Sequence, residues 1–279
     1  MTYLRLIELP WEGKVPTVKV NDINMYYEVH GEGEPLVMIN GAGAGIELFY
    51  GRNLKFSREY RLVLFDNRGA GRSDRPDMTY TMELMADDLA GLLDAVGIDS
   101  AHVYGISMGG MIAQHFALRY PEKVRSLILA VTCCGGPHSI RGSVADMAHI
   151  HELPLEEAVE AMIRLFVTEE FIDRNPDIFR QIIALMVKYP PVHSGLLKHT
   201  QAIATHDTYD RLPEITALTL VLAGDADRIV PVGNATILAS RIPNAELAIL
   251  KNTGHMLIET AGEVDRITLD FLRKHRTEN

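Results

Sequence analysis

Short apolar runs without polar alternation recur along this chain, and they constrain its fold more than any other feature. Such a run is typical of a strand that is covered on both faces, as in a parallel sheet between layers of helices. Segments with helical character separate the runs, so the alternation predicts an α/β fold. The runs are, in chain order, 36–39, 61–65, 102–104, 127–130 and 219–223.

Three further segments complete the expected sheet. Residues 18–20 and 24–29 form two short strands around a turn at Asn21 and Asp22, and 246–250 is a last strand. A tight turn can join only antiparallel neighbours, so the first two strands should form an antiparallel edge. We therefore expect the fold of a mostly parallel, twisted, eight-stranded sheet flanked by helices.

The strand pattern pauses in the second half of the chain. Segments 155–167 and 178–188 look helical there and are separated by prolines. A helical cap inserted between two parts of one α/β core explains this pause. The expected parts are a first core segment 1–134, a helical cap 135–212 and a second core segment 213–279.

Charge and composition exclude several classes of partner. The formal net charge is −10, from 37 acidic and 27 basic residues, which provides no basic surface for nucleic acid or for an anionic membrane. We find no leader-like start, no apolar run of membrane-spanning length and no cysteine framework, since Cys133 and Cys134 are adjacent. We expect a cytoplasmic protein that acts on a small molecule. Whether it forms a homodimer is left open.

Residues 105–109 have the sequence GISMG, which fits the pattern of a nucleophile turn. The motif follows a predicted strand and opens a predicted helix, and small residues at Gly105 and Gly109 permit a sharp bend between them. Such a bend exposes the hydroxyl of Ser107 at a helix N-terminus. Ser107 is therefore the candidate nucleophile; the alternative is an ordinary turn serine.

A serine hydroxyl needs a base, and the base needs an acid that fixes its tautomer. Among the 11 histidines, His255 lies in a loop directly after the last predicted strand, at the edge where the nucleophile turn is expected. The alternative for His255 is a surface-loop histidine. Asp225 and Asp227 both follow the strand 219–223, and spacing alone does not separate them. No histidine pair has zinc-ligand spacing near a carboxylate or cysteine, so no metal is expected, and no cofactor either.

Two backbone N–H groups should stabilise a negatively charged oxygen beside Ser107. The N–H of Met108, directly after the nucleophile, is one candidate. The glycine-rich loop after the strand 36–39 supplies the other, with the N–H of Ala42, after Gly41, as the best choice. The alternatives for this loop are a flexible segment without a role or, less well matched, a phosphate-binding loop.

Through these motifs the sequence resembles the α/β-hydrolase superfamily, and the resemblance extends along nearly the whole chain. It looks most similar to esterases and lactonases such as 3-oxoadipate enol-lactonase. In that family the acid stands three residues after the glycine at position 224, which implies Asp227. The matching stretches are 40–43 (NGAG), 65–73 (FDNRGAGRS), 105–110 (GISMGG), 224–227 (GDAD) with Pro231, and Gly254 with His255.

Positions at which this chain differs from particular groups of the superfamily narrow the choice among those groups. Many relatives have His-Gly where this chain has Asn40 and Gly41, and carbon–carbon bond hydrolases usually have a longer Gly-Gly-Gly-Pro-Gly loop, which is missing here. A serine at position 107 argues against haloalkane dehalogenases and epoxide hydrolases, whose nucleophile is aspartate.

The resemblance implies a carboxylesterase or lactonase that works through an acyl-enzyme. The alternatives are a carbon–carbon bond hydrolase, a perhydrolase or haloperoxidase-like enzyme with the same three residues, and a hydrolase-like receptor that only binds a small molecule. The cap, with apolar residues such as Met147, Met162, Phe166, Phe179 and Met186, either shapes the substrate pocket or forms a core of its own.

Overall fold

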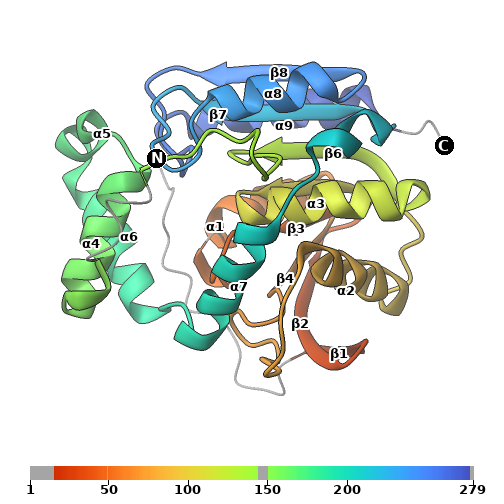
Figure 1. Cartoon of the computed structure of the whole chain (residues 1–279), viewed down its shortest axis with the longest axis horizontal. Helices are drawn as coiled ribbons and strands as arrows, with labels where there is room; N and C mark the ends of the chain where they lie inside the picture. The colour runs from red at the N-terminus through yellow and green to blue at the C-terminus, as the bar shows by residue number, and fades with distance from the viewer. Residues whose placement is uncertain (1–15, 49, 144–149, 277–279) are drawn as a thin grey trace.

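The computed structural model describes residues 16–48, 50–143 and 150–276, and its centre is one eight-stranded sheet (Figure 1). The order across the sheet is β1-β2-β4-β3-β5-β6-β7-β8. The pairs β1–β2 and β2–β4 are antiparallel, and all other neighbours in the sheet are parallel. The strands are β1 Thr17–Val20, β2 Ile23–His30, β3 Pro35–Ile39, β4 Arg61–Phe65, β5 Ala101–Ile106, β6 Val124–Ala130, β7 Thr219–Gly224 and β8 Ala245–Leu250.

The predicted fold class is confirmed, including the antiparallel edge. Each expected strand lies inside an observed one. In the five central strands β3 to β7 the apolar residues are covered on both faces, whereas the edge strands β1 and β8 are partly exposed. The chain passes from β3 to β4 on one side and returns to β5 on the other, so the strand order reverses between β3 and β5. Ligands of open α/β sheets bind outside the carboxyl ends of the strands at such a point.

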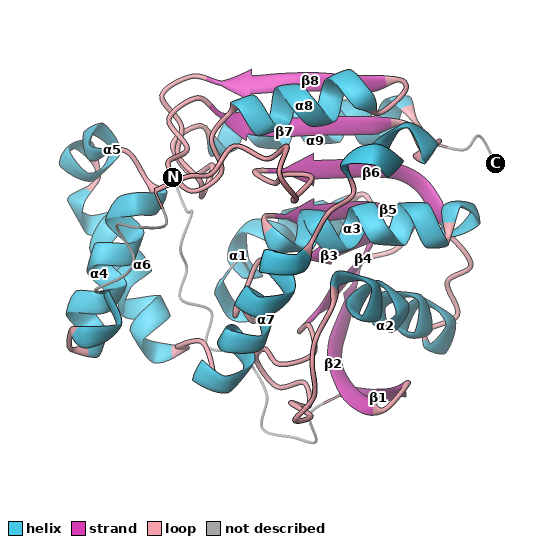
Figure 2. Cartoon of the chain, in the orientation of Figure 1, coloured by secondary structure: helices cyan, strands magenta, loops and turns pink. Residues whose placement is uncertain are grey.

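Helices cover both faces of the sheet (Figure 2). One apolar cluster joins Val37 and Ile39 of β3 to the helices α2, α3 and α8, and a second joins Leu36 and Met38 to α9. The helices are α1 Tyr50–Asn53, α2 Met82–Ala95, α3 Met108–Arg119, α4 Leu155–Phe166, α5 Glu169–Arg174, α6 Pro176–Lys188, α7 His193–Thr205, α8 Gly233–Arg241 and α9 Ala261–Lys274. Short 3-10 helices are η1 Ile46–Leu48, η2 Leu54–Arg58, η3 Pro121–Lys123, η5 Ile150–Glu152 and η6 Tyr209–Glu214.

The helices α4 to α7 lie between β6 and β7 in the chain and stand beyond the carboxyl ends of the strands (Figure 1). The helices α4 to α6 have an apolar core of their own, in which Phe179 and Met186 are buried and against which Met162 packs, whereas Ala202 of α7 belongs to the core that α2, α3 and α8 form with the sheet. These three side chains therefore belong to the interior of the cap. Met147 lies outside the described residues. No helix of the described chain combines the length and the apolar character needed to cross a membrane.

A buried pair of histidines joins the return segment of the cap to α3. His206 Nε2 donates a hydrogen bond to the carbonyl oxygen of Cys133 at 3.2 Å, so its Nδ1 accepts from His115 Nε2 at 3.1 Å. Burial, reinforced by the neighbouring His115, lowers the pKa of His206 to about 4. Burial also lowers the pKa of His102, His115 and His199.

Stability should therefore decrease on acidification. Between the ordinary pKa of 6.5 and about 4, the unfolded chain binds a proton at position 206 that the folded chain does not. Such a group costs up to about 1.4 kcal/mol of unfolding free energy per pH unit as the pH falls through this window. Urea denaturation between pH 7.5 and 4.5 measures the slope.

The variant His206→Gln keeps a donor for the Cys133 carbonyl and does not titrate, so its slope should be shallower. His193→Gln, which changes an exposed histidine of the cap, should leave the slope unchanged. Equal slopes for wild type and His206→Gln would contradict the assignment.

Candidate active site

Ser107 lies at a sharp turn between β5 and α3, with a backbone conformation that few residues adopt. Its φ is 55° and its ψ is −120°. A residue in such a conformation costs about 1–3 kcal/mol and persists only where its surroundings hold it. Two backbone bonds do so here: the Ser107 N–H donates to Ala130 at 2.9 Å, and the Ser107 carbonyl accepts from Gly110 at 2.9 Å.

Three glycines make this turn sterically accessible. A Cβ at Gly105 would lie 2.3 Å from the carbonyl oxygen of Gly109, and a Cβ at Gly110 would lie 2.6 Å from the Thr132 side chain. A Cβ at Gly109 would lie 2.1 Å from the carbonyl oxygen of Ile39. Positions 105 and 109 therefore need glycine for different reasons. Gly105 packs against the backbone of Gly109, whereas Gly109 packs against the end of β3.

The structure brings Ser107, His255 and Asp227 into one hydrogen-bonded chain. His255 Nε2 lies 3.0 Å from Ser107 Oγ, and His255 Nδ1 lies 2.8 Å from Asp227 Oδ2. Because the carboxylate can only accept, His255 Nδ1 carries the proton and Nε2 is left to accept from the serine hydroxyl. Both His255 and Asp227 are buried, at 7% and 6% exposure.

Asp227, and not Asp225, faces the histidine. The Oδ1 atom of Asp227 accepts from the N–H groups of Ile229 and Val230, both at 2.8 Å, which directs Oδ2 toward His255. Asp225 is exposed, and its N–H bonds to the carbonyl of Leu250. The geometry therefore agrees with the assignment that the resemblance implied and that spacing had left open.

The loop that carries His255 is fastened to the cap. Glu259 Oε1 accepts from the N–H of Gly254 at 3.1 Å and from the N–H of Thr168, at the start of α5, at 2.9 Å. The ring of Phe166 lies 5.3 Å from the ring of His255. Sequence reasoning did not single out Glu259, because an acid four residues after a histidine forms no recognisable pattern.

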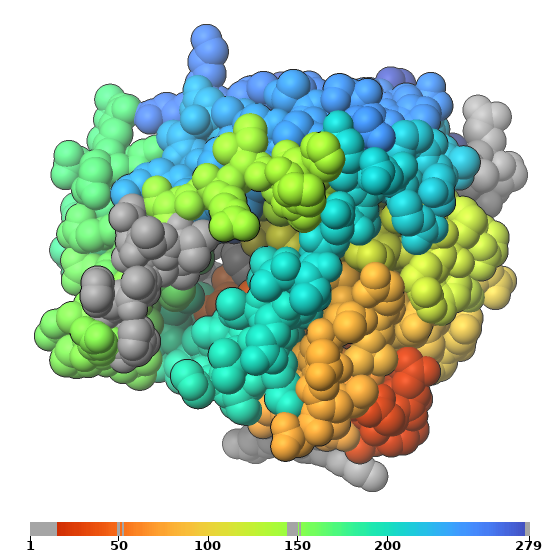
Figure 3. Space-filling view, in the orientation of Figure 1, coloured from red at the N-terminus to blue at the C-terminus, as the bar shows by residue number. Residues whose placement is uncertain are grey.

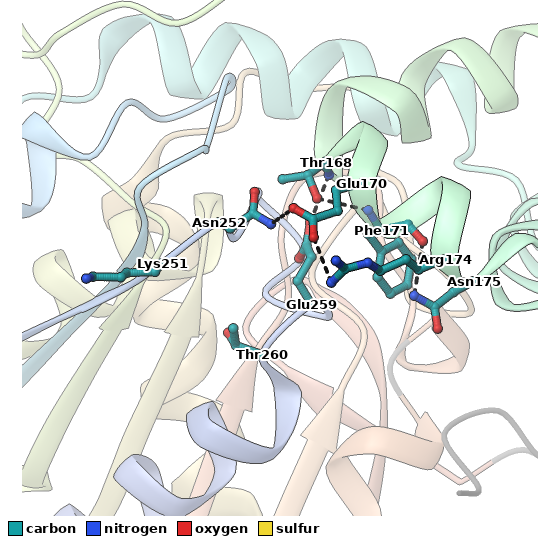
Figure 4. Close-up of a pocket in the computed structure, with 9 residues that line it drawn as sticks. All are labelled: Thr168, Glu170, Phe171, Arg174, Asn175, Lys251, Asn252, Glu259 and Thr260. Carbon is teal, nitrogen blue, oxygen red and sulfur yellow. Dashed lines mark hydrogen bonds and ion pairs between the residues drawn. The ribbon is translucent and has the colours of Figure 1, made fainter.

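A cavity of about 150 Å³ lies at the same junction, between α5 and the loop after β8 (Figure 4). Glu170 accepts there from Asn252 at 2.5 Å and pairs with Arg174 at 2.7 Å. The lining includes Glu259 but neither Ser107 nor His255. This cavity therefore belongs to the junction between cap and core, and the reacting groups lie outside it.

The glycine-rich loop after β3 lies directly against the serine. A Cβ on Gly41 would lie 3.4 Å from Ser107 Cβ, and Ala42 follows in the chain. Met108 is the first residue of α3, and the first N–H groups of a helix have no acceptor within it. The two candidate N–H donors to a charged oxygen are thus close to the hydroxyl in the chain: Met108 follows Ser107, and Ala42 follows Gly41, which lies against Ser107.

No group of three or more His, Cys, Asp or Glu residues within the described ranges is arranged to hold a metal ion. The Ser-His-Asp arrangement can activate a nucleophile through proton transfer alone.

The chain resembles known hydrolases over most of its length. Residues 34–154 match the family model described as alpha/beta hydrolase fold. The chain is 30% identical over 269 residues to a putative carbamate hydrolase, RutD, of Azorhizobium caulinodans, covering 90% of this chain and 100% of that protein. It is 31% identical over 294 residues to a 2-hydroxy-6-oxo-6-phenylhexa-2,4-dienoate hydrolase of Comamonas testosteroni, covering 94% of this chain and 95% of that protein.

A solved structure with a similar fold is that of a malate-bound thermophilic esterase from Thermogutta terrifontis. The TM-score is 0.80 at 27% identity, and the match covers 95% of this chain and 100% of that chain.

The variant Gly105→Ala should distort the turn, since its methyl group would collide with the Gly109 carbonyl. We expect a loss of about 1–3 kcal/mol of unfolding free energy and a slower reaction of Ser107 with a fluorophosphonate probe. Gly97→Ala is the control, because Gly97 has a φ of +69° and no neighbouring atom within 4 Å, so it incurs backbone strain alone. A normal labelling rate in Gly105→Ala would refute this account of the turn.

Proposed function

The chain belongs to the α/β-hydrolase family, and on that premise we propose that it is a serine hydrolase that cleaves a carboxylic ester or lactone of a small molecule. The observation that carries the proposal is the hydrogen-bonded chain from Ser107 Oγ through His255 to Asp227. This arrangement can move a proton off a hydroxyl and return it to a leaving group, as acyl transfer requires.

In the proposed mechanism, His255 Nε2 takes the proton of Ser107 as the serine oxygen attacks the substrate carbonyl. The imidazolium that forms is stabilised by Asp227, whose second oxygen is held by two backbone N–H groups. His255 then protonates the departing alcohol, which leaves an acyl group on Ser107. Water, deprotonated by the same histidine, hydrolyses this acyl-enzyme and releases the acid.

The N–H groups of Met108 and Ala42 are the proposed donors to the oxyanion. These N–H groups stabilise the oxyanion effectively because the backbone holds them in place before the negative charge develops, so no dipole has to reorient during the reaction. Removing one donor of this kind typically costs about 10²–10³ in kcat. The position of Met108 at the start of α3 adds the helix dipole to this stabilisation.

Cleavage of a carbon–carbon bond is a second candidate, because one relative at 31% identity is named as a hydrolase of a 2-hydroxy-6-oxo dienoate. The ester proposal is supported by the similarity to the esterase from Thermogutta terrifontis and by the short loop at residues 40–45, which lacks the triple-glycine sequence of carbon–carbon bond hydrolases. A panel of esters, lactones, carbamates and 2-hydroxy-6-oxo dienoates, compared by kcat/KM, separates the two. Turnover of the dienoates alone would reject the ester proposal.

Ser107→Ala should reduce ester hydrolysis by at least about 10⁴-fold and abolish the mass increase on fluorophosphonate labelling, because the nucleophile is lost. The melting temperature should stay close to that of wild type, since alanine is smaller than serine and leaves the backbone of the turn unchanged. Ser240→Ala, on α8, is the matched control and should retain both activities. Full turnover by Ser107→Ala would remove the basis of the mechanism, and an unlabelled wild type would favour a receptor.

Asp227→Asn should lower kcat by about 10⁴-fold, since the amide would favour the wrong tautomer of His255. Asp225→Asn, two residues earlier and exposed, should change kcat less than twofold. Steady-state kinetics on one ester tests both variants, and a larger loss in Asp225→Asn would exchange the two roles.

A further inference from the structure

His199, on the cap helix α7, contacts two loops of the core through both of its ring nitrogens. Its side chain is fully buried. The N–H of Gly43, in the loop after β3, donates to Nδ1 at 2.9 Å. Nε2 lies 2.7 Å from the carbonyl oxygen of Arg68, in the loop after β4. The imidazole therefore connects the cap to the loops after β3 and β4, of which the first lies against the serine.

These two partners allow only one form of the ring. A carbonyl oxygen can only accept, so Nε2 must carry a proton, and an N–H can only donate, so Nδ1 must offer its lone pair. His199 is thus a neutral imidazole with its proton on Nε2. Burial acts in the same direction, because it lowers the pKa of the ring.

The packing around His199 leaves little freedom for α7 to shift. A Cβ on Gly195, one turn earlier in α7, would lie 1.8 Å from the carbonyl oxygen of Gly69. A Cβ on Gly43 would lie 2.9 Å from the Pro191 side chain, just before the helix. In Figure 3, α7 (teal) lies against the segment that follows β4 (orange).

The loop that donates this bond needs an external contact to hold its conformation at Gly43. Gly43 has a φ of +68°, and glycines adopt positive and negative φ about equally well. The Ala42 N–H lies in the peptide plane that starts at Gly41, and the Gly43 N–H lies in the next plane, which starts at Ala42. The hydrogen bond to His199 fixes this second plane directly and thereby limits rotation about Ala42. The N–H of Ala44 bonds to the Gly41 carbonyl at 3.3 Å and closes the other side of the loop.

We propose that His199 is a positioning residue for the reaction: by holding the Gly43 N–H, its Nδ1 fixes the peptide plane that follows Ala42 and so limits rotation of the preceding plane, which carries the Ala42 N–H as an oxyanion donor. The cap thereby completes the site that stabilises the transition state. This inference rests on the proposed function, since it needs an oxyanion beside Ser107. A purely structural role for His199 is the rival explanation.

Two substitutions separate the two ends of the imidazole. In His199→Asn, Oδ1 can occupy the place of Nδ1 and accept from Gly43, whereas contact with Arg68 is lost. In His199→Gln, the amide nitrogen can reach the place of Nε2 and donate to Arg68, whereas no acceptor faces Gly43. We expect His199→Asn to keep kcat within about threefold of wild type and His199→Gln to lose about 10–100-fold in kcat at nearly constant KM.

Melting temperatures of the two variants provide the control for folding. Equal kcat losses in Asn and Gln variants, or losses that appear only in KM, would overturn the inference and leave a structural role. Wild type that neither hydrolyses esters nor reacts with a fluorophosphonate would reject the proposed function and, with it, this role. If the wild type hydrolyses esters and reacts with the fluorophosphonate, but the two variants have equal kcat, the role of His199 is rejected and the proposed function stands.

Should His199→Gln not fold, His199→Asn still tests the role through kcat, since a loss of more than about threefold would contradict it, and NMR on the wild-type protein tests the hydrogen bonds on which it depends. The ¹⁵N shifts of the His199 ring are expected to show a protonated Nε2 and an unprotonated Nδ1, with the Gly43 amide proton hydrogen-bonded to Nδ1. A ring protonated on Nδ1 would contradict the proposal.

Discussion

The contact between Gly109 and the end of β3 is the constraint on which the rest of the site depends. It lets α3 start so close to the Ile39 carbonyl that Ser107 and Gly41 become neighbours. The nucleophile turn and the loop that follows β3 are thereby fixed relative to each other by backbone packing alone. Any larger residue at position 109 would separate the hydroxyl from the N–H groups beside it.

Asp227 and His255 reach the same edge because their loops follow β7 and β8, which run parallel to β5. A parallel sheet places the ends of all such strands on one side, so residues distant in sequence converge without a special connection. A Cβ on Gly224, at the end of β7, would lie 2.0 Å from the Thr253 carbonyl, so these two loops also pack backbone to backbone. The sheet and this backbone contact therefore hold Asp227 and His255 in fixed positions relative to each other.

The sequence alone predicted the sheet, because apolar runs covered on both faces have a strong local signature. It also selected Ser107 and His255 as candidates, because each follows a strand in a short motif, and the structure places the two side chains within hydrogen-bonding distance. It did not distinguish Asp227 from Asp225, since the choice depends on which carboxylate the turn directs inward. Glu259 and His199 escaped prediction because their side chains bond to backbone N–H and C=O groups, and such contacts leave no pattern in residue types. The restriction on Gly109 likewise arises from another strand.

The cap is fastened to the core on both sides of the reacting serine, through Glu259 and Thr168 beside the base and through His199 beside the Gly43 loop. Evolution of a new substrate range in such a protein would require the cap to change sequence while these attachments persist. Residues of the cap interior can be replaced freely only where they do not move α7 or the start of α5. With the proposed function and the proposed role of His199, selectivity and turnover become coupled traits in this architecture, and exchanging the whole cap to change one would alter the other.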